Sequence, residues 1–220
     1  MRAVGLTRYL PVDDPRSLID CTLPQPEPGP HDLRVRVAAV SVNPVDTKVR
    51  APKAAVEATP RVLGWDAAGT VEAIGSEVTL FRPGDEVWYA GSIVRPGSNA
   101  EFQCVDERIA ALKPASLDFA AAAALPLTAI TAWEALFERL GLDPDGADAG
   151  RSLLIIGGAG GVGSIAIQLA RRAGLTTIVT ASRPETVEWC RALGATHVVD
   201  HRRPLPEQLT ALGFAQVDAI

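Results

Sequence analysis

The residues with the clearest chemical potential are those of one short run, which consists of Gly158, Ala159, Gly160, Gly161, Val162 and Gly163. Its first, third and sixth residues hold the glycine positions of the pattern G-x-G-x-x-G, which is typical of turns that bind dinucleotides. In such a turn the first glycine permits a tight bend, and the second lets the backbone approach a pyrophosphate. The third lets the following helix pack closely on the preceding strand. The run therefore predicts a dinucleotide site.

The segments on either side of this run are those that such a turn needs. Residues 153–156 are apolar, as in a buried strand, and Ile165, Leu169 and Ala173 fall on one face of a helix. The amino end of that helix would offer free N–H groups and a positive dipole end to phosphates. A glycine-rich turn in an ordinary α/β domain is the alternative that the pattern leaves open.

The end of the next predicted strand bears on the choice of cofactor. Sites for NAD place an Asp or Glu about 20 residues after the glycines, where it binds the ribose hydroxyls. Here that strand ends in Ala181, Ser182 and Arg183. A hydroxyl and a guanidinium suit a 2'-phosphate, because arginine donates charged hydrogen bonds to phosphate oxygens and an acid would repel them. Glu185, the nearest acid, follows Pro184 in a first helical turn, where the helix dipole explains it. These residues predict NADPH as the cofactor.

Composition and charge limit the classes of partner. The chain has 220 residues, of which 47% are hydrophobic, and its net charge of -5 comes from interspersed acids and bases. Without a basic block, nucleic acid and anionic membranes are not expected as partners, and a small molecule fits better. The first residues carry no apolar leader and no stretch approaches the roughly 20 apolar residues of a membrane span, which favours a cytoplasmic protein. Cys21, Cys104 and Cys190 are widely spaced and are expected to be buried, unpaired residues.

The period of the apolar residues divides the chain into two parts. Up to about Leu112 it reads as short strands separated by proline and glycine, such as DLRVRVAAVSV, AAGTVEAIG and GDEVWYAG. The proline-rich PQPEPGPHD should run over the surface. After the glycine run, strands (TTIVTAS, THVVD, VDAI) alternate with helices (PETVEWCRALGA, PLPEQLTALGF), which predicts a parallel sheet. The expected fold is α/β, with an irregular β domain over residues 1–124 and a doubly wound domain over residues 125–220.

Several segments, in their order along the chain, also resemble one known family. They are VNPVDTKVR, LGWDAAGTVEAIGSEV, PGDEVW, NAEFQCV, LPLTAITAWEAL, GGAGGVGSIAIQLAR and GATHVVD. Together they resemble the zinc-independent quinone-reductase branch of the medium-chain dehydrogenase/reductase superfamily, often labelled zinc-type alcohol dehydrogenase-like. The resemblance implies a GroES-like domain on the substrate side, a Rossmann domain that binds NADPH, and an active site in the cleft between them. For the full-length protein it also implies a homodimer.

The same resemblance bears on metal. The zinc-dependent relatives place a cysteine and the histidine of a GHE motif where this sequence has Asn43 and Trp65, which Asp66 follows. Catalytic zinc needs Cys, His or carboxylate donors that converge on it. The relatives' closely spaced cysteines for structural zinc are absent as well, so we expect no metal. Asp66 is expected to face solvent or to cap a turn, as aspartates in loops commonly do.

Without a metal, hydrogen-bond donors must polarise the substrate's carbonyl oxygen while hydride leaves the nicotinamide. The resemblance gives four candidates, Asn43, Asp46, Lys48 and Thr128. Asn43 and Asp46 match the family's N-x-x-D positions, Thr128 resembles a threonine near the nicotinamide, and Lys48 stands where quinone reductases often have a tyrosine. Structural alternatives are helix capping for Asp46, a solvated position for Lys48 and a bond to its own helical turn for Thr128.

One further candidate follows the third predicted strand. His201 stands where relatives often place a tyrosine near the adenine end of the cofactor, and it is expected to lie near the phosphate. A surface basic cluster with Arg202 and Arg203 is the alternative interpretation.

The leading hypothesis is an NADPH-dependent oxidoreductase that transfers hydride to a quinone or to an activated alkene such as an enone. A dinucleotide-binding protein without turnover is the alternative, and a zinc alcohol dehydrogenase is less favoured. The doubly wound sheet is expected to be truncated in its fourth strand, near Ile220. In that case the chain is either a fragment of a longer protein or has a sheet edge that another segment must cover.

Overall fold

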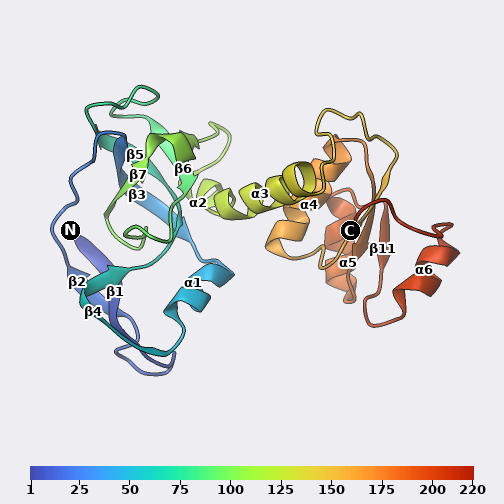
Figure 1. Cartoon of the computed structure of the whole chain (residues 1–220), viewed down its shortest axis with the longest axis horizontal. Coiled ribbons are helices and arrows are strands. Elements are labelled where there is room, and N and C mark those ends of the chain that lie inside the picture. Colours follow the sequence, from blue (N-terminus) through green and yellow to red (C-terminus); the bar gives the residue numbers. More distant parts are fainter. The chain divides into compact units, whose positions relative to one another are not determined.

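The computed structural model describes residues 1–220, and Figure 1 traces the chain through them. The chain forms two compact units, Met1–Leu127 and Thr128–Ile220. Each unit has a hydrophobic core of its own. The sequence-based boundary, between residues 124 and 125, falls just before this division.

The first unit consists of two antiparallel sheets with short helical segments (Figure 1). The three-stranded sheet has the order β2-β1-β4 and contains β1 (Arg2–Tyr9), β2 (Ile19–Thr22) and β4 (Lys53–Val62). The five-stranded sheet has the order β7-β3-β5-β6-β8 and contains β3 (Asp32–Ser41), β5 (Asp66–Ile74), β6 (Glu86–Ala90), β7 (Phe102–Asp106) and β8 (Ala110–Leu112). The helical segments are α1 (Pro44–Arg50), a 3-10 turn (Glu107–Ile109) and α2 (Phe119–Ala123).

Alternation of side chains explains β3. Leu33 and Val35 are fully buried in the core of the five-stranded sheet. Arg34, between them, points to the other face, where its Nε donates to Glu72 over 2.7 Å. The strands predicted from DLRVRVAAVSV, AAGTVEAIG and GDEVWYAG are confirmed as β3, β5 and β6.

Two details of the first unit differ from the expectations. β4 (Lys53–Val62) is absent from the predicted strands, because its exposed, alanine-rich sequence shows no alternation. Cys190, in the second unit, is buried as expected, but Cys21 and Cys104 are only half-buried. These two lie in β2 and β7, which are edge strands, so one side of each strand has no neighbour to cover it.

The second unit is a parallel sheet with helices on both faces. The sheet has the order β11-β10-β9. In chain order the elements are α3 (Pro126–Trp133), which begins in the first unit, a π-helical turn (Glu134–Arg139), β9 (Ser152–Ile155), α4 (Gly161–Arg172), β10 (Thr176–Thr180), α5 (Pro184–Ala192), β11 (His197–Val199) and α6 (Leu205–Ala211).

The two faces of this sheet are covered by different helices. On one face Val179 of β10 packs with Ile167 of α4 and Cys190 of α5. On the other face Ile178, the preceding residue of β10, packs with Leu205 of α6. In Figure 1 β11 lies between α5 and α6. Apolar residues at consecutive positions of one strand are the signature of a sheet buried on both faces. The predicted doubly wound fold is therefore confirmed.

The last residues of the chain join the sheet on the free side of β9. Ala219 forms a parallel bridge with Leu153, and the Leu154 N–H donates to the Ala219 carbonyl over 2.9 Å. The Asp218 carboxylate accepts from both the N–H and the hydroxyl of Ser152, each over 2.7 Å. The strand predicted from VDAI is thus present as this bridge. None of the helices combines the length and the apolar character that crossing a membrane requires.

Candidate functional site

The glycine turn joins β9 to α4 and is anchored on the end of β10. Gly157 has a φ of +75°, a conformation that residues with a side chain rarely adopt. Its N–H donates to the Thr180 hydroxyl over 2.8 Å, and the Gly158 N–H donates to the Thr180 carbonyl over 3.1 Å. The turn is therefore held in place by the residue that ends the neighbouring strand.

The three glycines of the G-x-G-x-x-G pattern differ in how much space surrounds the position of a Cβ atom. A Cβ on Gly158 would overlap Val179 Cγ1, in the core. A Cβ on Gly163 would lie 2.5 Å from the Gly157 carbonyl oxygen and 2.8 Å from Gly158 Cα. A Cβ on Gly160 would meet no protein atom nearer than 3.3 Å. Folding thus requires the first and third glycines, whereas the second leaves an open approach to the backbone, which fits a pyrophosphate.

A cavity of about 700 Å³ opens beside the turn. Gly157, Gly160, Gly161 and Val162 of the turn and of the start of α4 line it, together with apolar residues of β9 and of the helical segment before it. Its volume is in the range of small-molecule sites. Thr128 lies at the same place, since its Cγ2 is 3.1 Å from the position of a Cβ on Gly161. The structure thus brings Thr128 to the glycine turn within the second unit.

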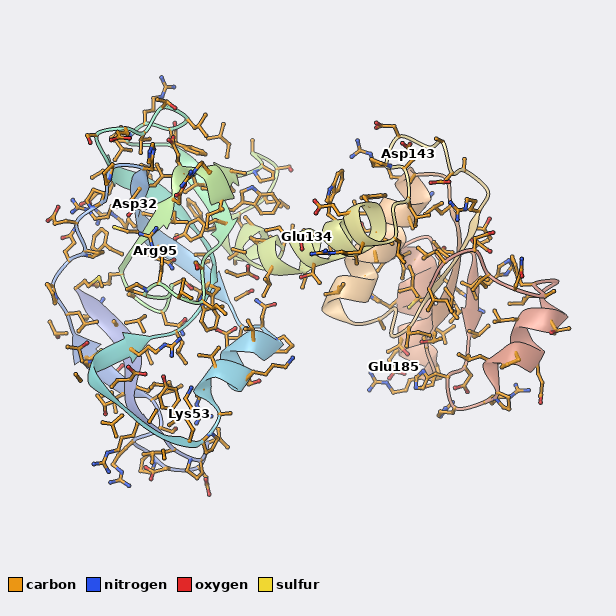
Figure 2. The ribbon with its side chains drawn as sticks, viewed as in Figure 1. Asp32, Lys53, Arg95, Glu134, Asp143 and Glu185 are labelled. Atoms are coloured by element: carbon orange, nitrogen blue, oxygen red, sulfur yellow. The ribbon has the colours of Figure 1, made fainter.

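The loop after β10 contains the residues that are expected to determine the preference for NADPH or NADH. Arg183 is exposed and pairs with Glu185 over 3.2 Å, so this acid does more than complement the helix dipole. Figure 2 labels Glu185, which lies at the start of α5. The Ser182 carbonyl accepts from Arg202 Nη2 over 2.6 Å. His201 is exposed, and no side-chain contact ties it to Ser182. Arg202 is therefore the basic residue of the loop after β11 that reaches this site.

In the first unit, Asn43 and Asp46 belong to a buried polar cluster. Asp46 is 9% exposed, and its carboxylate accepts from the Asn43 N–H over 2.7 Å at the start of α1. The Asn43 Nδ2 donates to Asp66 Oδ2 over 2.8 Å, and the Ser41 hydroxyl donates to the same oxygen over 3.0 Å. The other oxygen, Asp66 Oδ1, accepts from the Leu127 N–H over 2.8 Å. Asp66 therefore ties β3, the start of α1 and Leu127, the last residue of the first unit, to the start of β5.

The environment of Asp66 corrects an expectation. This residue does not face solvent, because its side chain is completely buried at the start of β5. Burial raises the pKa of Asp66, and the charge of Asp46 adds to the rise, while hydrogen bonds from Asn43, Leu127 and Ser41 oppose it. The local sequence gave no sign of this burial, since the three donors come from positions distant in the chain.

The residues of the first unit do not fit zinc at the position that zinc-dependent enzymes use. Trp65 is 2% exposed and packs with Leu6, Tyr9 and Leu63, and its indole N–H has no lone pair for a metal. The amide nitrogen of Asn43 is bound to Asp66. No three His, Cys, Asp or Glu side chains gather anywhere in the chain so that they could hold a metal ion. Lys48, the fourth expected site residue, is exposed on α1.

Comparison with known proteins identifies the family to which the chain belongs. Residues 29–115 match the family model of the alcohol dehydrogenase GroES-like domain, and residues 161–220 match that of zinc-binding dehydrogenases. A solved quinone oxidoreductase from Coxiella burnetii is 30% identical, with a TM-score of 0.80 over 100% of this chain and 68% of that protein. The chain belongs to the medium-chain dehydrogenase/reductase superfamily.

Other members of the superfamily are more similar in sequence. A zinc-type alcohol dehydrogenase-like protein of Staphylococcus aureus is 52% identical over 89% of this chain. A candidate zinc-dependent alcohol dehydrogenase from Rhizobium etli is 59% identical, with a TM-score of 0.91 over 97% of this chain and 63% of that protein. The chain spans 58% of the length of the Staphylococcus relative.

Two members carry names that mention different cofactors. An NADPH-dependent alkenal/one oxidoreductase of Arabidopsis thaliana is 39% identical over 89% of this chain and 51% of that protein. A solved NAD-dependent alcohol dehydrogenase is 34% identical, with a TM-score of 0.84 over 99% of this chain and 69% of that protein. Membership of the superfamily alone therefore does not choose between NADPH and NADH.

Proposed function

We propose that this chain is part of an NADPH-dependent oxidoreductase that reduces quinones or activated alkenes such as enones without a metal ion. The observation that carries the proposal is the open backbone at Gly160, followed one strand later by Ser182 and Arg183 in place of an acid. The first feature suits a pyrophosphate and the second a 2'-phosphate. The names of the Coxiella and Arabidopsis relatives support the two substrate classes.

When bound, NADPH supplies the hydride. In the proposed site the α4 amino end and the glycine turn would hold the pyrophosphate, and Thr128, beside Gly161, would lie near the nicotinamide end. Negative charge develops on the substrate oxygen as hydride arrives, so a donor there lowers the barrier. Lys48, whose ammonium is exposed, is proposed as such a donor on the resemblance alone. Asn43 and Asp46 are proposed on the same resemblance, and within the first unit their polar atoms bind Asp66 and the start of α1.

That last observation also favours the second candidate, a dinucleotide-binding protein without turnover. The Asn43 amide nitrogen donates to the buried Asp66 carboxylate over 2.8 Å and to the Ser41 hydroxyl over 3.5 Å, so both of its partners belong to the first unit's own polar cluster. Binding of NADPH would then occur without hydride transfer.

One experiment separates these candidates. The protein is titrated with NADPH, and NADPH oxidation is then followed with a simple quinone and with an enone, with and without a metal chelator. We expect saturable binding and turnover that the chelator leaves unchanged. Binding without turnover would support the second candidate, and activity that disappears on chelation would support a zinc enzyme.

Replacing Arg183 with alanine should change the cofactor preference. A hydrogen bond to a charged phosphate contributes about 1.5–3 kcal/mol, so Arg183→Ala is expected to weaken NADPH binding by about ten-fold or more. NADH lacks the 2'-phosphate, and its affinity should stay nearly the same. Both dissociation constants are measured by fluorescence titration. Equal losses for NADPH and NADH would contradict the assignment of Arg183.

A further inference from the structure

The loops after β10 and β11 lie side by side at one end of the parallel sheet. Thr180 and Val199, the last residues of these strands, are paired in register, and the Ala181 N–H donates to the Val199 carbonyl over 3.0 Å. Residues that follow the two strands are therefore neighbours although about 20 positions separate them in the sequence. Ser182 and Arg202 meet in this way.

Arg202 is fixed in this position by two partners. Its Nη2 donates to the Ser182 carbonyl over 2.6 Å and to Asp200 Oδ2 over 2.9 Å, and its Nε donates to Asp200 Oδ1 over 3.1 Å. The Nη1 atom has no hydrogen-bond partner within the chain. The Arg202 side chain is 63% exposed, so it is accessible to a ligand as well as oriented.

We infer that Arg202, rather than His201, is the second cation that binds the 2'-phosphate of NADPH, next to Arg183. This inference rests on the proposed function, because it assumes that a 2'-phosphate lies over the loop after β10. A bare carbonyl at Ser182 would repel phosphate oxygens. Here the Ser182 carbonyl accepts a hydrogen bond from the Arg202 guanidinium. The positive charge beside the carbonyl oxygen then favours a phosphate at this place.

The ion pair with Asp200 supports this role. Hydrogen bonds from Arg202 lower the pKa of Asp200 to about 2, so the carboxylate stays ionised and the pair persists across the neutral range. A free arginine loses rotamer freedom when it binds a ligand. Because Asp200 already holds Nε and Nη2, the planar guanidinium is oriented before a ligand binds, and its Nη1 remains available to the ligand. Asp200 is thus a positioning residue for Arg202.

The test uses 2',5'-ADP and 5'-AMP as paired probes, because they differ only in the 2'-phosphate and need no turnover. Calorimetric titration at pH 8 compares the wild-type protein with Arg202→Ala, Arg202→Gln, His201→Ala and Arg203→Ala. The glutamine variant keeps a donor for the Ser182 carbonyl but removes the charge. Arg203→Ala is the matched control, since Arg203 is also basic and exposed, but only Arg202 reaches Ser182.

Both Arg202 variants are expected to weaken 2',5'-ADP binding by about ten-fold and to leave 5'-AMP within two-fold of wild type. The His201 and Arg203 variants should stay within two-fold for both probes. The Arg202 inference is overturned if the wild type prefers 2',5'-ADP but the Arg202 variants bind it unchanged, while the proposed NADPH preference survives. If the wild type binds both probes equally, the NADPH preference itself fails and the inference fails with it.

Discussion

Replacing Gly163 with alanine is expected to lower the stability of the second unit by about 3 kcal/mol or more and to abolish dinucleotide binding. The new Cβ would lie 2.5 Å from the Gly157 carbonyl oxygen and 2.8 Å from Gly158 Cα. Both are backbone atoms, so no side-chain rotation relieves the overlap, and either α4 must move or the turn must open. Thermal unfolding by circular dichroism and NADPH titration measure the two effects.

Gly160→Ala is the matched control for this experiment. A Cβ at position 160 would meet only the Gly157 carbonyl oxygen, at 3.3 Å, and the backbone φ of -74° suits alanine. Its stability should stay within about 1 kcal/mol of wild type. NADPH binding should nevertheless fall by ten-fold or more, roughly 1.4 kcal/mol, because the methyl group fills the open approach to the backbone. Tight binding by Gly160→Ala would show that the pyrophosphate lies elsewhere.

Replacing Asp66 with alanine is expected to destabilise the first unit by about 3 kcal/mol, because it leaves three donors without their acceptor. These are the Asn43 amide, the Ser41 hydroxyl and the Leu127 N–H. Each donor without its acceptor costs about 1–3 kcal/mol, and relief from burying a carboxylate offsets part of the sum. Urea unfolding at pH 7 measures the loss. A variant as stable as wild type would show that solvent or a rearranged Asn43 replaces the carboxylate.

The pH dependence of stability provides a second, independent test of Asp66. The pKa of Asp66 is higher in the folded protein than its value of about 3.9 in the unfolded chain. At a pH between these two pKa values the folded protein binds more protons at Asp66 than the unfolded chain does. Stability therefore falls as the pH rises through this window. Asp66→Asn cannot ionise, so the stability of wild type relative to this variant should decrease from pH 3.5 upward. A difference that stays constant with pH would mean that the pKa of Asp66 is not raised.

The sequence was most informative where a chemical constraint is local. The alternation of side chains in β3 and the glycines of the turn each constrain residues that are adjacent in the chain. The same is true of Pro184, the first residue of α5, and of Gly194, just after the end of that helix. These features predicted the strand, the turn and the helix because their physical causes lie within a few positions.

The features that the sequence did not predict depend on contacts between distant segments. β4 has an exposed, alanine-rich sequence with Pro60 near its end, and pairing with β1, some 50 residues earlier, defines it as a strand. Asp66 is buried because donors from Ser41, Asn43 and Leu127 surround it. Arg202 reaches Ser182 because two strands are paired. No short-range pattern contains this information.

The bridge between Leu153 and Ala219 has a consequence for where a ligand can bind in the second unit. β10 lies on one side of β9 and Ala219 lies on the other, so the chain changes its direction of winding at β9. α4 and α6, which belong to the two connections, cover opposite faces of the sheet. At such a topological switch point the connections diverge beyond the carboxyl end of the strands and leave a crevice between them. The location of the proposed site therefore follows from strand order, and we expect replacements near Ser182 to change which dinucleotide is preferred without moving where it binds.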